Sequence, residues 1–434
     1  MVDADRRDRR ARRRLGAVVL AVLISQVLLY PGVPDLVVAL GAPRGIDAGM
    51  WFLVAEFAAF VAFAVLWGVA SDAIGRRTPL VVLGAAGGAC SYLALAAVPG
   101  LGGDFGTALA VRAVGGAFTI GAFSLAITTL MDLGGGHGRN MGAAGVAIGL
   151  GAALGSTAGG VLADIDPFYP VYAGAVVLGS AGLLAATVDD RSGRHRATSE
   201  PIAAGSGGLF VGSGGRSTEV DAPDVGFRDV IARVRSTPAL GVPFAFGFID
   251  RLTAGFFALV GVYYFQDPAT FDLSATGAGA TLALFFVPFA VLQAPFGTLS
   301  DRIGRFYPVV VGSVAYGLVI VGVGVAPVYP VAAALMVLVG VCGALMAPAT
   351  MALVTDLVDP AARGAAMGLF NVFGSLGFLT GFLVGGATTE AFGYRSAFLA
   401  VGGLELMIAV LLLPVVSRIA RRSDSTRVIE FSES

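Results

Sequence analysis

The sequence predicts an all-α integral membrane protein in which twelve transmembrane helices form two pseudo-symmetric six-helix bundles. The mean hydropathy is +0.84, and only 13% of the 434 residues are charged, whereas a soluble domain carries about a quarter. The apolar residues fall into blocks of roughly 20, the length that crosses about 30 Å of hydrocarbon. A polar motif also recurs after a long apolar run in each half of the chain.

The apolar blocks set the order of the expected elements. Residues 188–238 are the one long polar interruption, and they divide the spans six and six. They are the predicted linker, with an amphipathic helix over 227–234 at the membrane surface. The other predicted segments are a basic N-terminus at 1–14, bundles at 15–187 and 239–417, and a tail at 418–434. The predicted spans are 15–40, 47–70, 78–98, 105–131, 141–163, 170–187, 239–265, 273–298, 307–326, 329–355, 364–388 and 396–417.

The placement of arginine predicts the orientation. All 28 basic residues are Arg, and 24 of them fall in segments on one side of the spans, while only Arg44 and Arg395 fall in loops on the other side. Because basic loops stay in the cytoplasm, both termini are expected to be cytoplasmic, in a multi-pass protein of a prokaryotic plasma membrane. The Arg-rich start precedes an apolar run without an evident cleavage site, so we expect an uncleaved first helix.

Several classes of function lack the residues that they need. Cys90 and Cys342 lie inside apolar runs, which indicates neither a disulfide framework nor a metal site. His137 and His195 fall in predicted cytoplasmic loops without metal-ligand spacing, which argues against a membrane-embedded transferase. The sequence has no Gly-Lys-Ser/Thr phosphate loop, so ATP-driven transport is not expected. We expect no cofactor, metal or nucleic acid; the expected partners are a small-molecule substrate, the lipid bilayer and protons, and the expected unit is a monomer.

A polar turn follows the second and the eighth predicted spans. Its first copy reads Gly68-Val-Ala-Ser-Asp72-Ala-Ile-Gly75-Arg76-Arg77, and its second reads Gly297-Thr-Leu-Ser-Asp301-Arg302-Ile-Gly304-Arg305, 229 positions later. Gly75 permits a sharp reversal without a Cβ clash. Asp72 is an acid among arginines at the membrane edge, where it can cap a helix N-terminus or pair with an Arg across the bundle. An ordinary positive-inside loop is the alternative, but it does not explain the second copy.

Two further patterns recur in the same order. Asp132 and Arg139 match Asp356 and Arg363 at a shift of 224 positions. A ladder of glycines four residues apart recurs at a shift of 226 positions, and such a stripe lets two helices pack closely. The ladder consists of Gly151, Gly155, Gly159 and Gly160 in the fifth span and of Gly377, Gly381, Gly385 and Gly386 in the eleventh. The halves are therefore expected to be internal repeats, as in carriers.

The predicted spans contain buried charges. Arg112 lies about 10 Å inside the fourth span, where a charge costs at least about 2.5 kcal/mol, so it should face a polar cavity, a carboxylate or backbone carbonyls. Its counterpart in the second half is Met336. Glu56 and Asp250 lie near the midplane, where carriers place substrate and ions, and burial there favours a carboxyl group that loads and releases protons. A structural ion pair is the alternative for both acids.

The predicted proton and substrate pathway includes residues beside these charges. Arg251 follows Asp250 and points about 100° away from it, so Arg251 is expected to face an acid on another helix. In the first span, Pro31 and Pro34 loosen the helix toward its outer end. The pathway residues are Tyr30, Asp35, Glu56, Arg112, Asp250 and Arg251.

The duplicated turn resembles the loop signature of the major facilitator superfamily, G-x-x-x-D-x-x-G-R-[KR], and its weaker echo in the second half. The resemblance covers nearly the whole chain and implies the major facilitator fold. It also implies that the Asp and Arg side chains form a latch between the halves that stabilises the outward-facing state. The implied latch residues are Gly68, Asp72, Gly75, Arg76, Arg77, Asp301, Arg302 and Arg305, with Arg139 and Arg363.

Three other patterns resemble signatures of this family. The glycine ladder is similar to the antiporter signature G-x-x-x-G-P-x-x-G-G, although Ser156 replaces the proline. Arg112 is similar to the Arg of R-x-x-Q-G, which is linked to proton coupling, although Gly115 replaces the amide. The P-x-x-P of the first span resembles the drug:proton antiporter branch. Glu405 lies in the twelfth span, which is peripheral in this family, so the resemblance implies packing or an oligomer contact.

The expected function is secondary active transport by alternating access, in the form of proton-coupled export of small amphipathic compounds of the multidrug type. The aromatic residues that follow Asp250 are expected beside the cavity: Phe256, Phe257, Tyr263, Tyr264 and Phe265. The missing antiporter proline leaves open a proton- or ion-coupled importer of a polar metabolite. A membrane-embedded transferase and a non-transporting sensor of the same fold are the remaining hypotheses.

Overall fold

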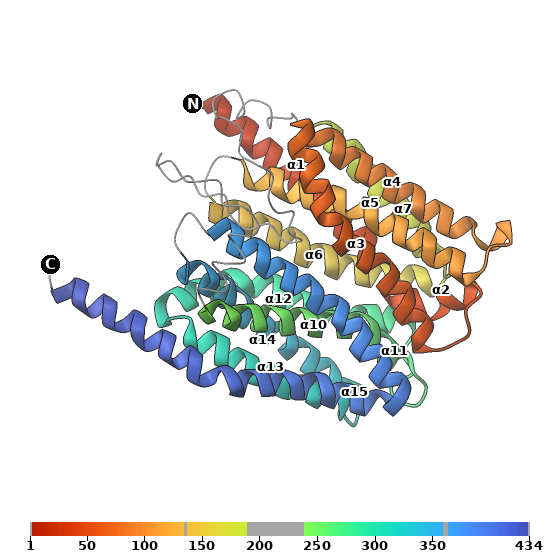
Figure 1. The fold of residues 1–434 in the computed structure, drawn as a ribbon. Coiled ribbons are helices and arrows are strands. Elements are labelled where there is room, and N and C mark those ends of the chain that lie inside the picture. Colours follow the sequence, from red (N-terminus) through yellow and green to blue (C-terminus); the bar gives the residue numbers. More distant parts are fainter. Residues whose placement is uncertain (1, 134–136, 189–237, 359–362, 433–434) are drawn as a thin grey trace.

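The chain folds into long helices that run side by side (Figure 1). The computed structural model describes residues 2–133, 137–188, 238–358 and 363–432, and it describes side chains for 9–133, 144–188, 239–358 and 366–414. The amphipathic helix predicted over 227–234 lies outside the described residues.

The helices of the first half begin with a segment that the double proline interrupts. α1 (Val2–Val27) ends before the 3-10 turn η1 (Tyr30–Gly32), and α2 (Val33–Ala39) continues toward the outer end, as Pro31 and Pro34 predict. The remaining elements are α3 (Ile46–Ile74), α4 (Thr78–Ala97), η2 (Pro99–Leu101), α5 (Phe105–Met131), α6 (His137–Ala163) and α7 (Tyr169–Ala186).

The helices of the second half follow the same order. Its first span begins with the 3-10 turn η3 (Pro238–Leu240) and contains a π-helical turn, η4 (Phe257–Gly261), between α10 (Gly241–Phe256) and α11 (Val262–Gln266). Proline and periodicity give no sign of this π turn. The remaining elements are α12 (Ala275–Ile303), α13 (Phe306–Gly324), α14 (Tyr329–Asp356) and α15 (Arg363–Ser432).

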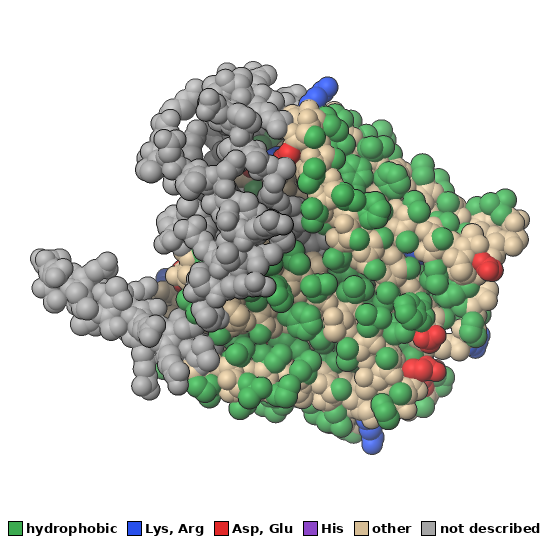
Figure 2. Space-filling model, viewed as in Figure 1, with side chains coloured by type: hydrophobic (Ala, Val, Ile, Leu, Met, Phe, Trp, Pro, Cys, Tyr) green, Lys and Arg blue, Asp and Glu red, His purple; other side chains and the backbone are tan. Residues whose placement is uncertain are grey.

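Twelve membrane spans are present, as predicted. Among the described residues, eleven helices are long and apolar enough to cross a membrane, and the last of these, Ala366–Pro414, has 49 residues. The backbone of Gly393 leaves the helical region with φ +80°, so this segment is two spans joined at a sharp break. Large apolar side chains cover the outside of the bundle (Figure 2), which suits a surface that faces hydrocarbon.

The packing partners repeat between the halves, which identifies two equivalent bundles. In the first half α3 packs on α5 and α4 packs on α7; in the second half the corresponding α12 packs on α14 and α13 packs on α15. Likewise α1 packs on α6 and α10 packs on α15. Between the halves, α6 packs on α12, and α3 packs on α15. This arrangement is the two-bundle fold that the sequence predicts.

The glycine ladders make the equivalent helix crossing in each half. A Cβ atom on Gly151 or Gly155 would lie 2.9 Å from a carbonyl oxygen of α1, that of Leu20 or Ile24 respectively. Gly377 and Gly381 meet the backbone of α10 in the same way. Because any side chain would separate these helices, the ladder is the reason that the two backbones touch.

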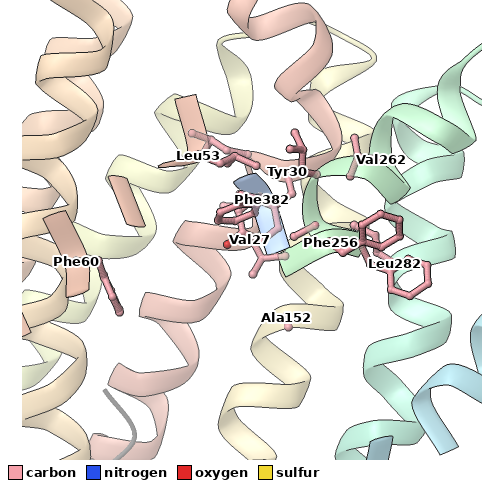
Figure 3. Close-up of a cluster of buried hydrophobic side chains, with 14 of the residues drawn as sticks. Val27, Tyr30, Leu53, Phe60, Ala152, Phe256, Val262, Leu282 and Phe382 are labelled. Carbon is pink, nitrogen blue, oxygen red and sulfur yellow. The ribbon is translucent and has the colours of Figure 1, made fainter. Parts of the chain in front are cut away.

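The two bundles meet through apolar side chains near the centre of the molecule. Figure 3 shows Val27, Leu53 and Ala152 of the first half gathered around Phe256 and Phe382 of the second. These residues belong to one buried cluster that is continuous across both bundles. Phe57 of α3 also stacks on Phe378 of α15, with ring centroids 4.6 Å apart.

Candidate substrate and proton pathway

A fully buried ion pair lies in the first half. Arg112 on α5 donates a hydrogen bond from Nη2 to Glu56 Oε2 on α3, and the two residues are only 3% and 4% exposed. The helices approach closely here because Gly116, one turn after Arg112, packs against the backbone of Glu56. The two charges that the sequence places in separate spans therefore satisfy each other inside the bundle.

Aromatic rings surround this pair. The guanidinium carbon of Arg112 lies 4.7 Å from the ring centroid of Phe52 and 5.6 Å from that of Tyr92. The Tyr92 hydroxyl donates to the carbonyl oxygen of Ser25, 2.8 Å away. Tyr30 is buried within electrostatic range of both charges. Rings and hydroxyls thus hold the cation in a cage with little water.

The second half contains a more open pair. Asp250 is 7% exposed, and Nε of Arg251 lies 3.6 Å from its Oδ2 atom. The two adjacent side chains therefore approach each other, although their positions on α10 predicted that they would diverge. Arg251 also lies against α15, because a Cβ atom on Gly374 would be 3.2 Å from its Cγ atom. Its side chain is 24% exposed.

Glu405 is a third buried acid, and the expectation of an oligomer contact is wrong for it. The residue is 0% exposed and faces the inside of the second bundle, where Oε1 accepts a hydrogen bond from Ser313 Oγ on α13. A residue without exposed surface cannot contact another protomer. The packing alternative is the one that the structure supports.

The aromatic residues after Asp250 form packing core in the second bundle. Phe256 and Phe257 contact Phe398 of α15 with centroid distances of 4.9 and 5.9 Å, and Tyr264 contacts it at 4.8 Å. Phe265 is fully buried. Tyr263 also reaches the other bundle, where its ring packs against Gly49. The expectation that this whole group lines a cavity is therefore not met by these contacts.

The duplicated turns form ion pairs inside each half. Arg77 donates to Asp132 at the end of α5, and Arg305 binds Asp356 at the end of α14, with 3.1 Å between Nε and Oδ2. Arg305 also donates to Asp301. Burial opposes the charge of Arg305, but both carboxylates outweigh it and raise its pKa above the ordinary value. The repeated Asp132 and Asp356 thus bind the repeated arginines.

The glycines of both turns have a positive φ, and at Gly75 this backbone makes the sharp reversal that the sequence predicts. Gly75 has φ +68° and closes α3 with a hydrogen bond to the Ser71 carbonyl, and Gly304 has φ +86°. Asp72 is half-buried beside Gly75, while Gly68, Arg76 and Arg302 are half or fully exposed. Among the ion pairs of the described residues, none joins a turn of one half to the other half. The side chains of Arg139 and Arg363 lie outside the described residues.

Hydrogen bonds join the two halves at one end of the bundles. This end contains residues 40–45 and 267–274, and it is called the outer end because the predicted orientation places it outside the cell. Asp164, after α6, accepts hydrogen bonds from the backbone N–H groups of Ala275 and Thr276, at 2.8 and 3.0 Å. Gln266 Nε2 donates to the carbonyl oxygen of Pro31, at 2.8 Å. Asp164 therefore caps α12 from the other half.

The paired glycines join this closure. The last glycine of each ladder packs against the other half. Gly160 contacts the start of α12, and Gly386 contacts Met50 of α3. Gly159 and Gly385 still pack within their own halves. Asp35 is exposed at this end, within electrostatic range of Tyr263, and is remote from the buried pairs. The cap, the amide contact and the glycines together close the outer end.

The sequence was compared with families of known proteins. The profile described as Major Facilitator Superfamily matches residues 15–268 and 244–432, which is most of the chain. This chain belongs to the major facilitator superfamily. It is therefore a multi-pass membrane transporter rather than an enzyme, and the resemblance of its duplicated turn is confirmed.

The curated relatives in this superfamily include drug transporters at low identity. The tetracycline resistance protein, class G, of Vibrio anguillarum is 28% identical over 366 residues, which are 81% of this chain and 85% of that protein. The multidrug efflux pump LfrA of Mycolicibacterium smegmatis is 29% identical over 142 residues, 32% of this chain and 28% of the pump. The probable actinorhodin transporter of Streptomyces coelicolor is 36% identical over 31% of this chain and 24% of its own length.

Solved structures of the superfamily share the fold. The human organic anion transporter MFSD10 matches with a TM-score of 0.66 and 21% identity, over 93% of this chain and 99% of that one. A bacterial homologue of the lysosomal transporter Spinster, in an inward-facing and unoccupied conformation, matches with a TM-score of 0.71 and 14% identity, over 95% and 97%. At these identities the likeness concerns the fold alone.

Sequence reasoning missed four parts of this transporter's site. Tyr92 and Ser313 are polar residues inside apolar runs, and that position is the only signal that they carry. Asp164 follows directly on a predicted span, which is compatible with an ordinary solvated loop. The π turn at Phe257–Gly261 is a backbone feature without a composition signal. Each depends on which helices become neighbours.

Proposed function

We propose that this transporter exports small amphipathic compounds in exchange for protons by alternating access. The observation that carries the proposal is the set of ionisable side chains buried inside the spans of both bundles, Glu56 with Arg112 and Asp250 with Arg251. Buried charges are costly in a membrane and are typical of ion and proton pathways. A proton gradient, rather than a cofactor, supplies the energy in this proposal.

The two pairs have different roles in the proposed cycle. Asp250 is the proton-binding carboxylate, because it is buried inside the second bundle and its partner Arg251 lies 3.6 Å away, at the distance of an ion pair. Arg112 and Glu56, with Tyr30, form the polar wall of the pathway in the first half. Asp35 lies at the outer mouth. Protonation of Asp250 releases Arg251 and changes the charge that the substrate meets.

Alternating access follows from the two ends of the bundles. In the closed outer end, Asp164 and Gln266 each bind the opposite half. The ion pairs of Arg77 with Asp132 and of Arg305 with Asp356 lie within their own halves in this state. We propose that the turns with Asp72, Arg76 and Arg77, and with Asp301, Arg302 and Arg305, latch the halves together once the outer end opens. Gly68, Gly75, Arg139 and Arg363 complete that latch.

The relatives support export of compounds of the drug type. A curated relative that matches 81% of this chain is named for tetracycline resistance, and a shorter match is a multidrug efflux pump. The P-x-x-P element, which resembles the drug:proton antiporter branch, lies at the break between α1 and α2. We further propose that the transporter is a monomer in a prokaryotic plasma membrane, with both termini in the cytoplasm.

Transport in proteoliposomes with an imposed pH gradient tests the proposal. The panel contains lipophilic cations, neutral drugs and polar metabolites, and empty liposomes are the control. Movement of an amphipathic compound against the proton flux is the expected result. If ΔpH drives no compound of the panel in either direction, the proton coupling is refuted.

Import of a polar metabolite is the second candidate. It is favoured by Ser156, which stands where the antiporter signature has proline and is fully buried with its hydroxyl bonded to Ala153 O, 3.1 Å away. α6 therefore continues without a proline kink. Uptake of a polar metabolite together with protons, in the same proteoliposomes, would identify this function.

A further inference from the structure

The second bundle contains a buried carboxyl group that the proposed pathway does not use. Glu405 is 0% exposed, and its Oε1 atom accepts a hydrogen bond from Ser313 Oγ. Its other oxygen, Oε2, has no hydrogen-bond partner among the described residues. The Glu405 carboxyl group thus accepts one hydrogen bond from an uncharged donor. A buried, ionised carboxylate would need a cation beside it to offset the loss of water.

The groups that face Glu405 come from two helices, α13 and α10. α13 contributes Ser313 and Tyr316, and α10 contributes Asp250, with which Glu405 interacts electrostatically. Around Tyr316 lie Asp250 and Arg251 of α10, Cys342 of α14 and Glu405 itself. The one cation in this set lies 3.6 Å from Asp250. The set thus contains two acids, Asp250 and Glu405, and one arginine, and the arginine forms its ion pair with Asp250.

This imbalance favours a proton on Glu405. Removing a carboxylate from water costs several kcal/mol unless a cation or several hydrogen bonds replace the solvent. The neutral carboxylic acid avoids this cost, and it provides an O–H donor at the oxygen that lacks a partner. The negative charge of Asp250 acts in the same direction, because like charges in one site disfavour a second ionisation.

Tyr316 lies within electrostatic range of both acids. Its hydroxyl is buried and has no hydrogen-bond partner among the described residues. It lies one turn after Ser313 on the same face of α13, and it interacts electrostatically with both Asp250 and Glu405. A hydroxyl group both donates and accepts, so it can receive a proton from one carboxyl group and pass its own to another.

We propose that Glu405 is a second proton-binding site, which exchanges its proton with Asp250 through the Tyr316 hydroxyl. The O–H bond of the Glu405 carboxyl group breaks as the Tyr316 oxygen accepts that proton, and the phenolic proton moves to the Asp250 carboxylate. The reverse transfer restores the starting state, and no other reactant is needed. The exchange with Asp250 rests on the proposed proton coupling, whereas the protonation of Glu405 does not.

Infrared spectroscopy of the purified, full-length transporter tests the proton on Glu405 without any substrate. At neutral pH the wild type should show a carbonyl band of a protonated carboxyl group that Glu405→Gln loses. Glu390→Gln is the matched control, because Glu390 is an exposed acid in the preceding span, before the break at Gly393, and its change should leave the spectrum unchanged. Gln keeps an acceptor for Ser313, and a thermal melt checks the fold. A Glu405→Gln spectrum identical to that of the wild type would overturn the proposal.

Transport tests the exchange with Asp250. Tyr316→Phe keeps the ring and removes the hydroxyl, so it should retain the infrared band of Glu405 and change the pH dependence of transport. Glu405→Gln should change that pH dependence in the same way. An unchanged pH profile in both variants would refute the exchange. If the wild type is not driven by protons at all, the proposed function fails, while the infrared result still decides the state of Glu405.

Discussion

The two bundles repeat their packing but not their buried charges. The glycine ladders of α6 and α15 make the same crossing, and the turns that contain Arg77 and Arg305 bind the matching Asp132 and Asp356. The charges inside the spans have no such correspondence: Arg112 has Met336 as its counterpart in the sequence, and Met336 is a fully buried apolar residue. The repeated elements build the scaffold, and the unrepeated ones give each half its own chemistry.

The charge balance differs as well. In the first half Glu56 and Arg112 form a neutral pair, so a proton on Glu56 would leave a buried arginine uncompensated. In the second half, Arg251 pairs with Asp250, and the hydrogen bond that Glu405 accepts comes from the neutral Ser313, so one proton makes this set neutral. Proton binding is therefore cheaper in the second half, and the first half provides a fixed polar wall.

Breaking the pair of the first half should have the largest effect on stability. Arg112→Leu leaves Glu56 buried without a cation, and we expect a loss of about 3–5 kcal/mol, seen as a lower melting temperature of the purified transporter. The double variant Glu56→Gln with Arg112→Leu should recover part of the loss, because it removes the orphaned charge. Equal melting temperatures for the single and the double variant would contradict the pairing.

Enlarging a ladder glycine should have a similar effect in both halves. Gly151→Leu and Gly377→Leu each push a side chain into the backbone of the neighbouring helix, which should cost about 1–3 kcal/mol. Gly403→Ala is the matched control, since a Cβ atom there meets nothing within 4 Å, and its melting temperature should stay near that of the wild type. A tolerated leucine in one half alone would show that the crossings are not equivalent.

Loss of the cross-half cap should open the outer end. Asp164→Ala removes the acceptor for two N–H groups of α12, which should cost the closed state about 1 kcal/mol, or roughly a fivefold change in its population. Labelling of a cysteine placed at exposed Asp35 and of one at exposed Arg76 reports the access to each end. We expect faster labelling at the outer end and slower labelling at the inner end. Unchanged labelling at both ends would show that the Asp164 cap does not stabilise the closed outer end.

The same cap predicts a pH dependence. Burial raises the pKa of Asp164, but hydrogen bonds from Thr276, Ser274 and Ala275 outweigh it and hold the pKa below the ordinary value. The cap should therefore contribute fully above a pH of about 4 and be lost only as the pH falls through the lower pKa. The measured quantity is the labelling rate of the outer-end cysteine divided by that of a free cysteine at the same pH. We expect this ratio to be constant above a pH of about 4 and to rise below it. A rise near neutral pH would contradict it.

Removing a turn arginine should have the smallest effect. Arg77→Ala and Arg305→Ala break partly exposed ion pairs, in which Asp132 and Asp356 are 54% and 51% exposed, so each should cost about 0.2–1 kcal/mol and less at high salt. Melting temperatures at low and high ionic strength measure this. A large, salt-independent loss in either variant would show that the turn has a role beyond its own half.

The sequence predicted the scaffold better than the site. Span length, the Arg distribution and the repeated motifs depend on residues that are near one another in the chain, so the twelve spans and the glycine crossings could be predicted. The partners of the buried charges depend on which helices become neighbours. Glu56 and Arg112 were each identified as buried charges, but their pairing was not, and for Glu405 the peripheral helix left packing and an oligomer contact as alternatives.

The most direct test of the account is transport by Asp250→Asn in proteoliposomes with an imposed pH gradient, compared with the wild type and with Asp272→Asn. Asp272 is an exposed acid in the loop after α11, outside the spans. The account predicts that Asp250→Asn still exchanges substrate across the membrane but no longer accumulates it, while Asp272→Asn accumulates it as the wild type does. Wild-type accumulation by Asp250→Asn would contradict the claim that the charges of the second half bind the coupled proton.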